Sequence, residues 1–225
     1  TLSVVIESDG KDEVDESVKP KGDLSSLSGQ EIINIVKEAG IVGMGGAMFP
    51  AHVKLNIPEG KTVDTVLLNG AECEPYLTVD DRIMVEQPEE VVFGLKALMK
   101  AVDVDNGAIG IEDNTPEAIE ALRKATANEP NIEIVPLETK YPQGGEKMLI
   151  TAVTGREVPS GGLPADAGCV VNNVTTAVAL AKAIKEGRPL IDRSITITGR
   201  GIKEPQNVIA KVGTSVAELI EQAGG

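Results

Sequence analysis

The stretch VDTVLLNG, residues 63–70, begins the series of elements that decides the fold, with its first strand predicted over residues 63–68. It is a short apolar run that ends in Asn-Gly, which is typical of a buried strand. Two more strands are predicted over residues 107–111 and 132–135, with helices predicted over residues 88–102 and 116–127 before them. Strands and helices that alternate at these lengths predict parallel strands joined by right-handed crossovers. We therefore expect a Rossmann-like α/β sheet.

Upstream of this strand, a capped helix leads into the densest glycine stretch of the chain. Ser28 and Glu31 match a capping box, which predicts a helix over residues 30–39 that Gly40 ends. The next stretch, GIVGMGGAMFPAHVKL, covers residues 40–55. Its glycines let the backbone approach a ligand with free N–H groups, although a flexible surface loop is the plain alternative. The stretch does not fit the dinucleotide fingerprint, because a helix rather than a strand precedes it.

Downstream of the predicted sheet strands, the pattern of predicted elements changes near Gly187. Before it, a helix is predicted over residues 144–154, and an apolar segment leads into a helix from residue 174 to about 186. After it, two short strands and a short helix are expected at residues 194–198, 208–212 and 215–222, which predicts a small β-grasp domain. We expect three parts: a remnant of a preceding domain or linker with a possible strand at its start, the sheet domain, and the β-grasp domain, at residues 1–27, 28–187 and 188–225.

The composition excludes several classes of protein. The formal net charge of −14 and the sequence pI near 4.6 argue against nucleic acid as a partner. No apolar run reaches the ~18 residues that a membrane span requires, so we expect contact with a membrane only through partners. Cys73 and Cys169 are the only cysteines and His52 is the only histidine. These residues cannot supply the four ligands of an iron–sulfur cluster or a structural zinc site, so no metal site is expected.

The segment NGAECEPY, residues 69–76, directly follows the first predicted strand. Ligands of open α/β sheets bind beyond the carboxyl ends of the strands, so Asn69, Glu72 and Glu74 are candidate ligand contacts. Carboxylates there would accept hydrogen bonds from a ribose or from a ring N–H. A polar turn with a solvated face is the alternative.

Two further segments break the regular pattern at predicted helix starts. In KYPQGGEKM, residues 140–148, Gly144 and Gly145 are expected to expose backbone donors to an anion or a ring carbonyl, unless they form an ordinary helix entry. In VVNNVTT, residues 170–176, Asn173 either caps a helix or helps to hold a phosphate.

Three of the four aromatic side chains, Phe49, Tyr76 and Tyr141, fall in these loops. A protein core would normally bury its aromatic side chains, because they offer the largest apolar surfaces. Aromatic rings in glycine loops favour stacking on a flat ligand.

Five motifs together resemble, in order and spacing, the C subunit of the Rnf electron transport complex, a relative of the NADH-oxidising flavoprotein subunit of respiratory complex I. They are GGAMFPAHVKL, NGAECEPY, YPQGGEKMLI, TGREVPSGGLP and VVNNVTT. The segment from residue 194 to the last residue is similar to the soluble-ligand-binding β-grasp (SLBB) domain of that family. The resemblance implies a flavin mononucleotide (FMN) site, and NAD(H) as the partner of the flavin in hydride transfer.

The resemblance also implies roles for individual residues. FMN would be contacted by Gly43, Gly45, Gly46, Lys54, Asn69, Glu72 and Glu74, and the flavin and nicotinamide pocket would be completed by Tyr141, Gly144, Gly145 and Glu146. Asn172 and Asn173 would lie near the phosphate, and Phe49 would offer its ring to NADH. Glu74 and Glu146 would be the catalytic carboxylates, and Lys54 would stabilise the reduced flavin anion.

Two departures from the family pattern bear on function. Met48 stands where family members usually have glycine, and its thioether would narrow the nicotinamide pocket. The family also carries [4Fe-4S] clusters after the β-grasp domain, which this chain does not contain. The chain is therefore expected to be the FMN- and NAD-binding fragment of an ion-translocating ferredoxin:NAD oxidoreductase. We expect it to be peripheral on the cytoplasmic side of the membrane. Its expected partners are other Rnf subunits, with ferredoxin as an indirect partner. A cobalamin reductase of the microcompartment type and a flavin-free docking scaffold are the alternatives.

Overall fold

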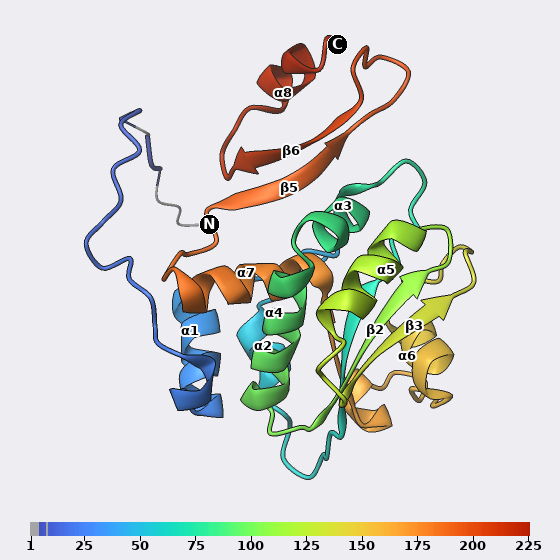
Figure 1. Ribbon diagram of the computed structural model, residues 1–225. Helices are drawn as coiled ribbons and strands as arrows, with labels where there is room; N and C mark the ends of the chain where they lie inside the picture. Colours follow the sequence, from blue (N-terminus) through green and yellow to red (C-terminus); the bar gives the residue numbers. More distant parts are fainter. Residues whose placement is uncertain (1–4, 8) are drawn as a thin grey trace.

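A parallel sheet forms the centre of the molecule (Figure 1). The structure is a computed structural model that describes residues 5–7 and 9–225, so most of the possible N-terminal strand lies outside the described residues. The sheet has the order β3-β2-β1-β4, and all its neighbouring strands pair in parallel. The expected Rossmann-like α/β sheet is confirmed. The strands are β1 (Thr65–Gly70), β2 (Asn106–Glu112), β3 (Ile132–Leu137) and β4 (Cys169–Asn173).

Strand β1 begins and ends about two residues later than predicted. Asn69, which we expected in a loop, is still a strand residue because it pairs with Gly110 of β2 on one side and with Asn173 of β4 on the other. The two pairings place Asn69 and Asn173 together at the carboxyl ends of β1 and β4.

Helices cover both faces of the sheet, which explains why its strands read as continuous apolar runs. Val66 and Leu68 of β1 pack into the larger core cluster, whereas Leu67 points into the smaller one on the other face. The larger cluster is covered by α1 (Gly29–Glu38), α2 (Ala51–Leu55), α3 (Val79–Glu86), α4 (Pro88–Ala101), α5 (Pro116–Ala125) and α7 (Val174–Lys185); the smaller is covered by α6 (Glu146–Thr154) and the 3-10 helix η2 (Pro164–Ala167).

Helix α4 packs closely against α7. A Cβ on Gly94 would lie 2.1 Å from the carbonyl oxygen of Ala177, so only glycine permits this approach. Helix α3 was not predicted, because its eight residues bury only Ile83 and Met84 and show little helical periodicity.

The predicted capping box at the start of α1 is confirmed. The Ser28 N–H donates to Glu31 Oε2 over 2.7 Å, and the Glu31 N–H donates back to Ser28 Oγ over 3.3 Å. Gly40 then takes a φ of 65°, the left-handed conformation that ends the helix. The short 3-10 helix η1 (Leu24–Ser26) precedes α1.

A second, two-stranded sheet follows α7 and lies at the top of the molecule in Figure 1. It consists of β5 (Asp192–Ile197) and β6 (Gln206–Lys211), which pair antiparallel, and is followed by α8 (Val216–Gln222). The predicted order of strand, strand and helix is confirmed. We call residues 192–225 the C-terminal unit. Among the described helices, none has the length and apolar character needed to cross a membrane.

Candidate cofactor site

One cavity of about 610 Å³ runs along β4 to the carboxyl ends of β1 and β4. The chain passes from β1 to β2 on one side, and β4 then joins the sheet on the other side of β1. Open α/β sheets bind ligands at such a switch point, and the volume is within the usual range for small-molecule sites. Of the predicted residues, the cavity is lined by Gly43, Gly45, Phe49, Lys54, Asn69, Gly144, Glu146, Asn172 and Asn173.

The glycine loop, residues 43–49, closes at its base over one side of the cavity. Val42 and Pro50 form a β-bridge, and the N–H of Gly43 donates to the carbonyl of Phe49 over 2.8 Å. The expectation of free amides is therefore wrong for Gly43. Within the described residues, the amides of Gly45 and Gly46 have no protein acceptor, and these two donors remain open to a ligand.

The mouth of the glycine loop carries two exposed apolar side chains, Met48 and Phe49. Met48 has a φ of 52°, a region that a residue with a Cβ rarely adopts. This geometry gives a physical reason for the glycine expected at that position by family resemblance.

Lys54, on α2, connects the glycine loop side of the cavity to α6. Its Nζ lies 2.6 Å from Glu146 Oε2 and 3.1 Å from the carbonyl oxygen of Val171. Both side chains of the ion pair are about one third exposed, at 30% and 38%. An ammonium group has three donors, so one N–H of Lys54 remains for a ligand. Glu146 offsets part of the positive charge that Lys54 brings to the cavity.

The two glycines of the YPQGG segment do not expose the backbone donors that the sequence predicted. The N–H of Gly144 donates to Cys73 Sγ over 3.2 Å, and that of Gly145 donates to the carbonyl of Pro142 over 2.9 Å. A Cβ on Gly144 would lie 2.2 Å from the carbonyl oxygen of Ala71. Close packing of two loops therefore requires Gly144, and this steric need was not visible in the sequence.

The side chains of the NGAECEPY segment separate in space. Asn69 lines the cavity, and its amide donates to the carbonyl of Gly144 over 2.7 Å. Glu72 instead lies at the start of α3, where it accepts from the N–H groups of Asp80 (3.1 Å) and Asp81 (3.3 Å). Burial, and then the charge of Asp80, raise the pKa of Glu72 to about 7.

Besides Glu72, four of the predicted residues do not line the cavity. Glu74 and Tyr141 are exposed, and Tyr141 precedes Pro142 in a cis peptide bond. Gly46 and Gly145 belong to loops that border the cavity through their neighbours Gly45, Gly144 and Glu146.

The two asparagines at the end of β4 have different environments. Asn173 caps α7, because its Oδ1 accepts from the N–H of Thr175 over 2.9 Å, while its Nδ2 donates to Asp80 over 2.6 Å. Asn172 is 3% exposed and lines the cavity, and its Nδ2 has no acceptor within the described residues. A buried donor without a partner is costly, so a ligand acceptor in the cavity would complete this site.

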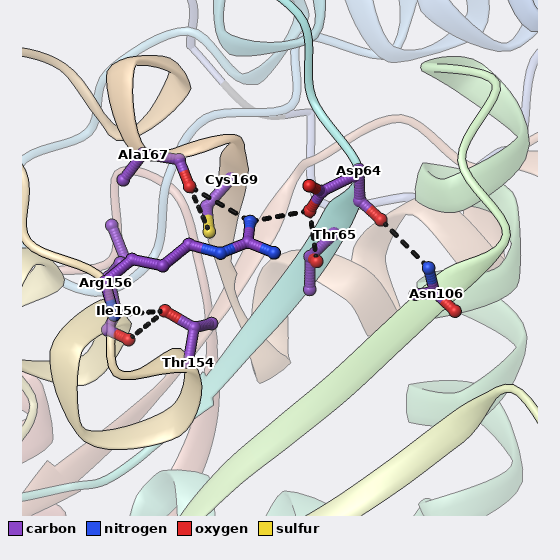
Figure 2. A network of polar contacts seen from close by, with 8 residues as sticks. All are labelled: Asp64, Thr65, Asn106, Ile150, Thr154, Arg156, Ala167 and Cys169. Atoms are coloured by element: carbon purple, nitrogen blue, oxygen red, sulfur yellow. Dashed lines mark hydrogen bonds and ion pairs between the residues drawn. The ribbon is translucent and has the colours of Figure 1, made fainter.

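Arg156 anchors a loop that supplies residues to the cavity lining, and Figure 2 shows its polar contacts. Its Nη1 donates to Asp64 Oδ1 over 2.7 Å, at the start of β1, and to the carbonyl of Ala167 over 3.1 Å. The segment between Arg156 and Ala167 supplies Leu163, Pro164 and Ala165 to the lining. The arginine belongs to the TGREVPSGGLP motif, but nothing in the sequence alone indicated its partner.

Comparison with known families identifies two matching domains. The family profile of the Nuo51 FMN-binding domain matches residues 36–182, and that of the SLBB domain matches residues 194–225. The chain also superimposes on a chain from the crystal structure of NAD+-reducing [NiFe]-hydrogenase in the H2-reduced state, with a TM-score of 0.73 and 21% sequence identity, over 91% of this chain and 41% of that one. The expected fold, a flavin-type α/β domain followed by an SLBB unit, is confirmed.

Curated proteins with similar sequences belong to ion-translocating complexes. The C subunit of the Na(+)-translocating ferredoxin:NAD(+) oxidoreductase complex of Acetobacterium woodii is 56% identical over 224 residues, which cover 100% of this chain and 51% of that protein. Its proton-translocating counterpart from Clostridium ljungdahlii is 53% identical over 99% of this chain and 49% of its own length. The chain thus spans about half the length of these relatives. They confirm the resemblance to the C subunit of Rnf-type complexes.

Proposed function

We propose, for a chain that belongs to the Nuo51 FMN-binding domain family, that the cavity at the β1–β4 switch point binds FMN for electron transfer with NAD(H). The single observation that carries this proposal is Asn172, a residue of the cavity lining whose buried Nδ2 has no acceptor among the described residues. FMN offers phosphate, hydroxyl and ring carbonyl oxygens, each of which can accept that hydrogen bond. The unengaged amide of Gly45 adds a further donor at the same cavity wall, and that of Gly46 follows it in the glycine loop that borders the cavity.

The chemistry of the donor set also fits FMN. Bound FMN would supply a ring that takes up two electrons as hydride and releases them singly. The remaining N–H of Lys54 would bind an electron-rich edge of that ring or a phosphate oxygen. Its positive charge would favour the reduced flavin anion over the neutral oxidised flavin. Glu146 keeps Lys54 in place through the 2.6 Å ion pair.

The exposed ring of Phe49 at the mouth of the cavity is the surface that we assign to the nicotinamide. Met48 stands beside it and would limit the width of that entrance. Glu74 and Tyr141 are exposed in the described structure and do not line the cavity. Their proposed roles therefore require contact with a bound ligand that extends beyond the cavity.

The names of the relatives suggest the wider setting. They are subunits of ion-translocating ferredoxin:NAD(+) oxidoreductase complexes. We propose that this chain works in such a complex, peripheral on the cytoplasmic side of a membrane, with other subunits as direct partners and ferredoxin as an indirect one. Iron–sulfur clusters outside the chain would accept the electrons one at a time. Residues 28–187 would be the FMN domain and residues 188–225 the SLBB-type β-grasp domain.

A flavin titration of the purified chain tests the proposal. We expect FMN to bind with a shift of its absorption band near ~450 nm, and NADH to bleach that band. Riboflavin serves as the control ligand, because it lacks the phosphate. If saturating FMN leaves its spectrum and fluorescence unchanged, the chain is a scaffold without flavin and the proposed function is wrong.

A further inference from the structure

The C-terminal unit contacts the glycine loop directly. Arg193 of β5 donates from Nη2 to the carbonyl oxygen of Met44 over 2.8 Å. The N–H of the same residue, Met44, donates to Thr176 Oγ1 of α7 over 3.0 Å. Both peptide groups that flank Met44 are therefore held, one by α7 and the other by β5. The unengaged amides of Gly45 and Gly46 follow immediately.

Asp80 lies between the same two elements. Its carboxylate accepts from Asn173 Nδ2 and from Thr175 Oγ1, each over 2.6 Å. Burial raises the pKa of this carboxylate, and the hydrogen bonds from Thr175 and Asn173, followed by the positive charge of Arg193, partly oppose that rise. Asp80 thus sets the orientation of the Asn173 amide at the cavity wall and lies within electrostatic range of Arg193.

The start of α3, which carries Asp80, is also bonded to the C-terminal unit. The N–H of Thr78 donates to Thr196 Oγ1 of β5 over 3.2 Å, and Asn207 Nδ2 of β6 donates to the Thr78 carbonyl over 3.1 Å. The C-terminal unit is therefore bonded both to the glycine loop and to the start of α3. The glycine loop lines the cavity, and the start of α3 is bonded to the lining residue Asn173 through Asp80.

We propose that Asp80 and Arg193 are positioning residues of the cofactor site, and that the C-terminal unit holds the glycine loop in the shape that binds the flavin. This inference rests on the proposed FMN function. Neither side chain lines the cavity, so both act through the groups that do: Arg193 through the Met44 peptide, and Asp80 through Asn173.

The physical reason is the conformational freedom of the loop. A segment with glycine at positions 43, 45 and 46 has high entropy when unrestrained, and a ligand that has to order it loses affinity. A hydrogen bond from a charged donor to a carbonyl holds that loop before the ligand arrives. Losing one such bond lowers affinity by about tenfold.

The test compares Arg193→Met with Arg200→Met in the full chain. Arg200 is an exposed arginine in the turn after β5, so its substitution removes the same charge from the same unit. In the chain without added flavin, we expect Arg193→Met to raise hydrogen exchange of the bonded amides of Gly43 and Met44 by about tenfold, with unchanged exchange in β1 and β4. We expect its FMN dissociation constant to rise by a similar factor. Arg193→Lys should restore part of both effects, because it keeps the charge without the planar donor.

Asp80→Asn forms a second test, with the exposed Asp105→Asn as its control. Here we expect weaker FMN binding and faster exchange at residues 172–175. Should Asp80→Asn fail to fold, the Arg193 series still decides the question.

The outcomes separate this inference from the proposed function. An unmodified chain that does not bind FMN overturns both. If that chain binds FMN and Arg193→Met binds it equally well with unchanged loop exchange, the inference alone is wrong. If Arg193→Met raises exchange uniformly across the sheet and lowers global stability to match, Arg193 has a merely structural role. That outcome also contradicts the inference.

Discussion

Lys54 Nζ and Glu146 Oε2 lie 2.6 Å apart beside β4, although 92 positions separate the two residues in the chain. The contact joins α2, which follows the glycine loop, to the first residue of α6. Two stretches that the sequence indicated separately therefore form one wall of one cavity.

Substitution of Lys54 should affect ligand binding far more than stability. Lys54→Met keeps the apolar stem and removes the charge, so we expect FMN to bind about tenfold more weakly. The free energy of unfolding should change by less than about 1 kcal/mol, because the ion pair is partly exposed. Lys185→Met removes a comparable ion pair, with Glu90, from the outer surface of α7 and serves as the control. Equal FMN affinities for the two variants would contradict the assignment.

Asn172→Leu should change stability and binding in opposite directions. The side-chain Nδ2 is buried without an acceptor among the described residues, so its removal should leave the ligand-free chain equally stable or more stable by about 1 kcal/mol. The same change should weaken FMN binding by about tenfold. Urea unfolding and flavin titration measure the two effects. A variant that loses stability and keeps its affinity would show that Asn172 has a structural role only.

Gly45 and Gly144 should respond differently to alanine. A Cβ on Gly144 would meet the Ala71 carbonyl oxygen at 2.2 Å, whereas one on Gly45 would come no closer than 3.7 Å to its nearest neighbour, Asn173. We expect Gly144→Ala to destabilise the fold by about 2 kcal/mol or more. Gly45→Ala should leave stability within about 0.5 kcal/mol and reduce FMN affinity, because the added methyl group enters the cavity wall. Thermal unfolding with and without FMN separates the two cases.

The pKa of Glu72 predicts a pH dependence of stability. Burial and the charge of Asp80 raise it to about 7, above its value of 4.5 in an unfolded chain. The unfolded chain therefore loses this proton first, and the stability that the protonated group contributes is lost as the pH rises from about 4.5 through 7. Glu72→Gln cannot titrate, so its stability relative to the unmodified chain should increase across that interval and then level off.

Urea unfolding at several pH values between about 5 and 8 measures this effect, with the exposed Glu74→Gln as the control. A stability difference between Glu72→Gln and the unmodified chain that is the same at every pH contradicts the assigned pKa.

The sequence predicted the elements of the sheet well, because their signals are local. Pro88 and Pro116 begin α4 and α5 as expected, and the capping box at Ser28 begins α1. It missed α3, whose few buried residues give little periodicity. It also assigned free donors to Gly144 and Gly145, since nothing local reveals that Cys73 and Pro142 accept from them.

The sequence by itself determined the parallel α/β class, the small C-terminal unit and the stretches from which the cavity is built. Hydrophobic periodicity, proline and glycine act over a few residues, so these features can be read along the chain. Only the tertiary structure decided which side chains of those stretches enter the cavity. Asn172 and Asn173 are adjacent in β4, but the Nδ2 of Asn172 has no partner among the described residues, whereas Asn173 caps a helix. The reason is that neighbouring strand residues point to opposite faces and meet different elements. The pairing of Arg193 with Met44 likewise depends on how two distant elements pack.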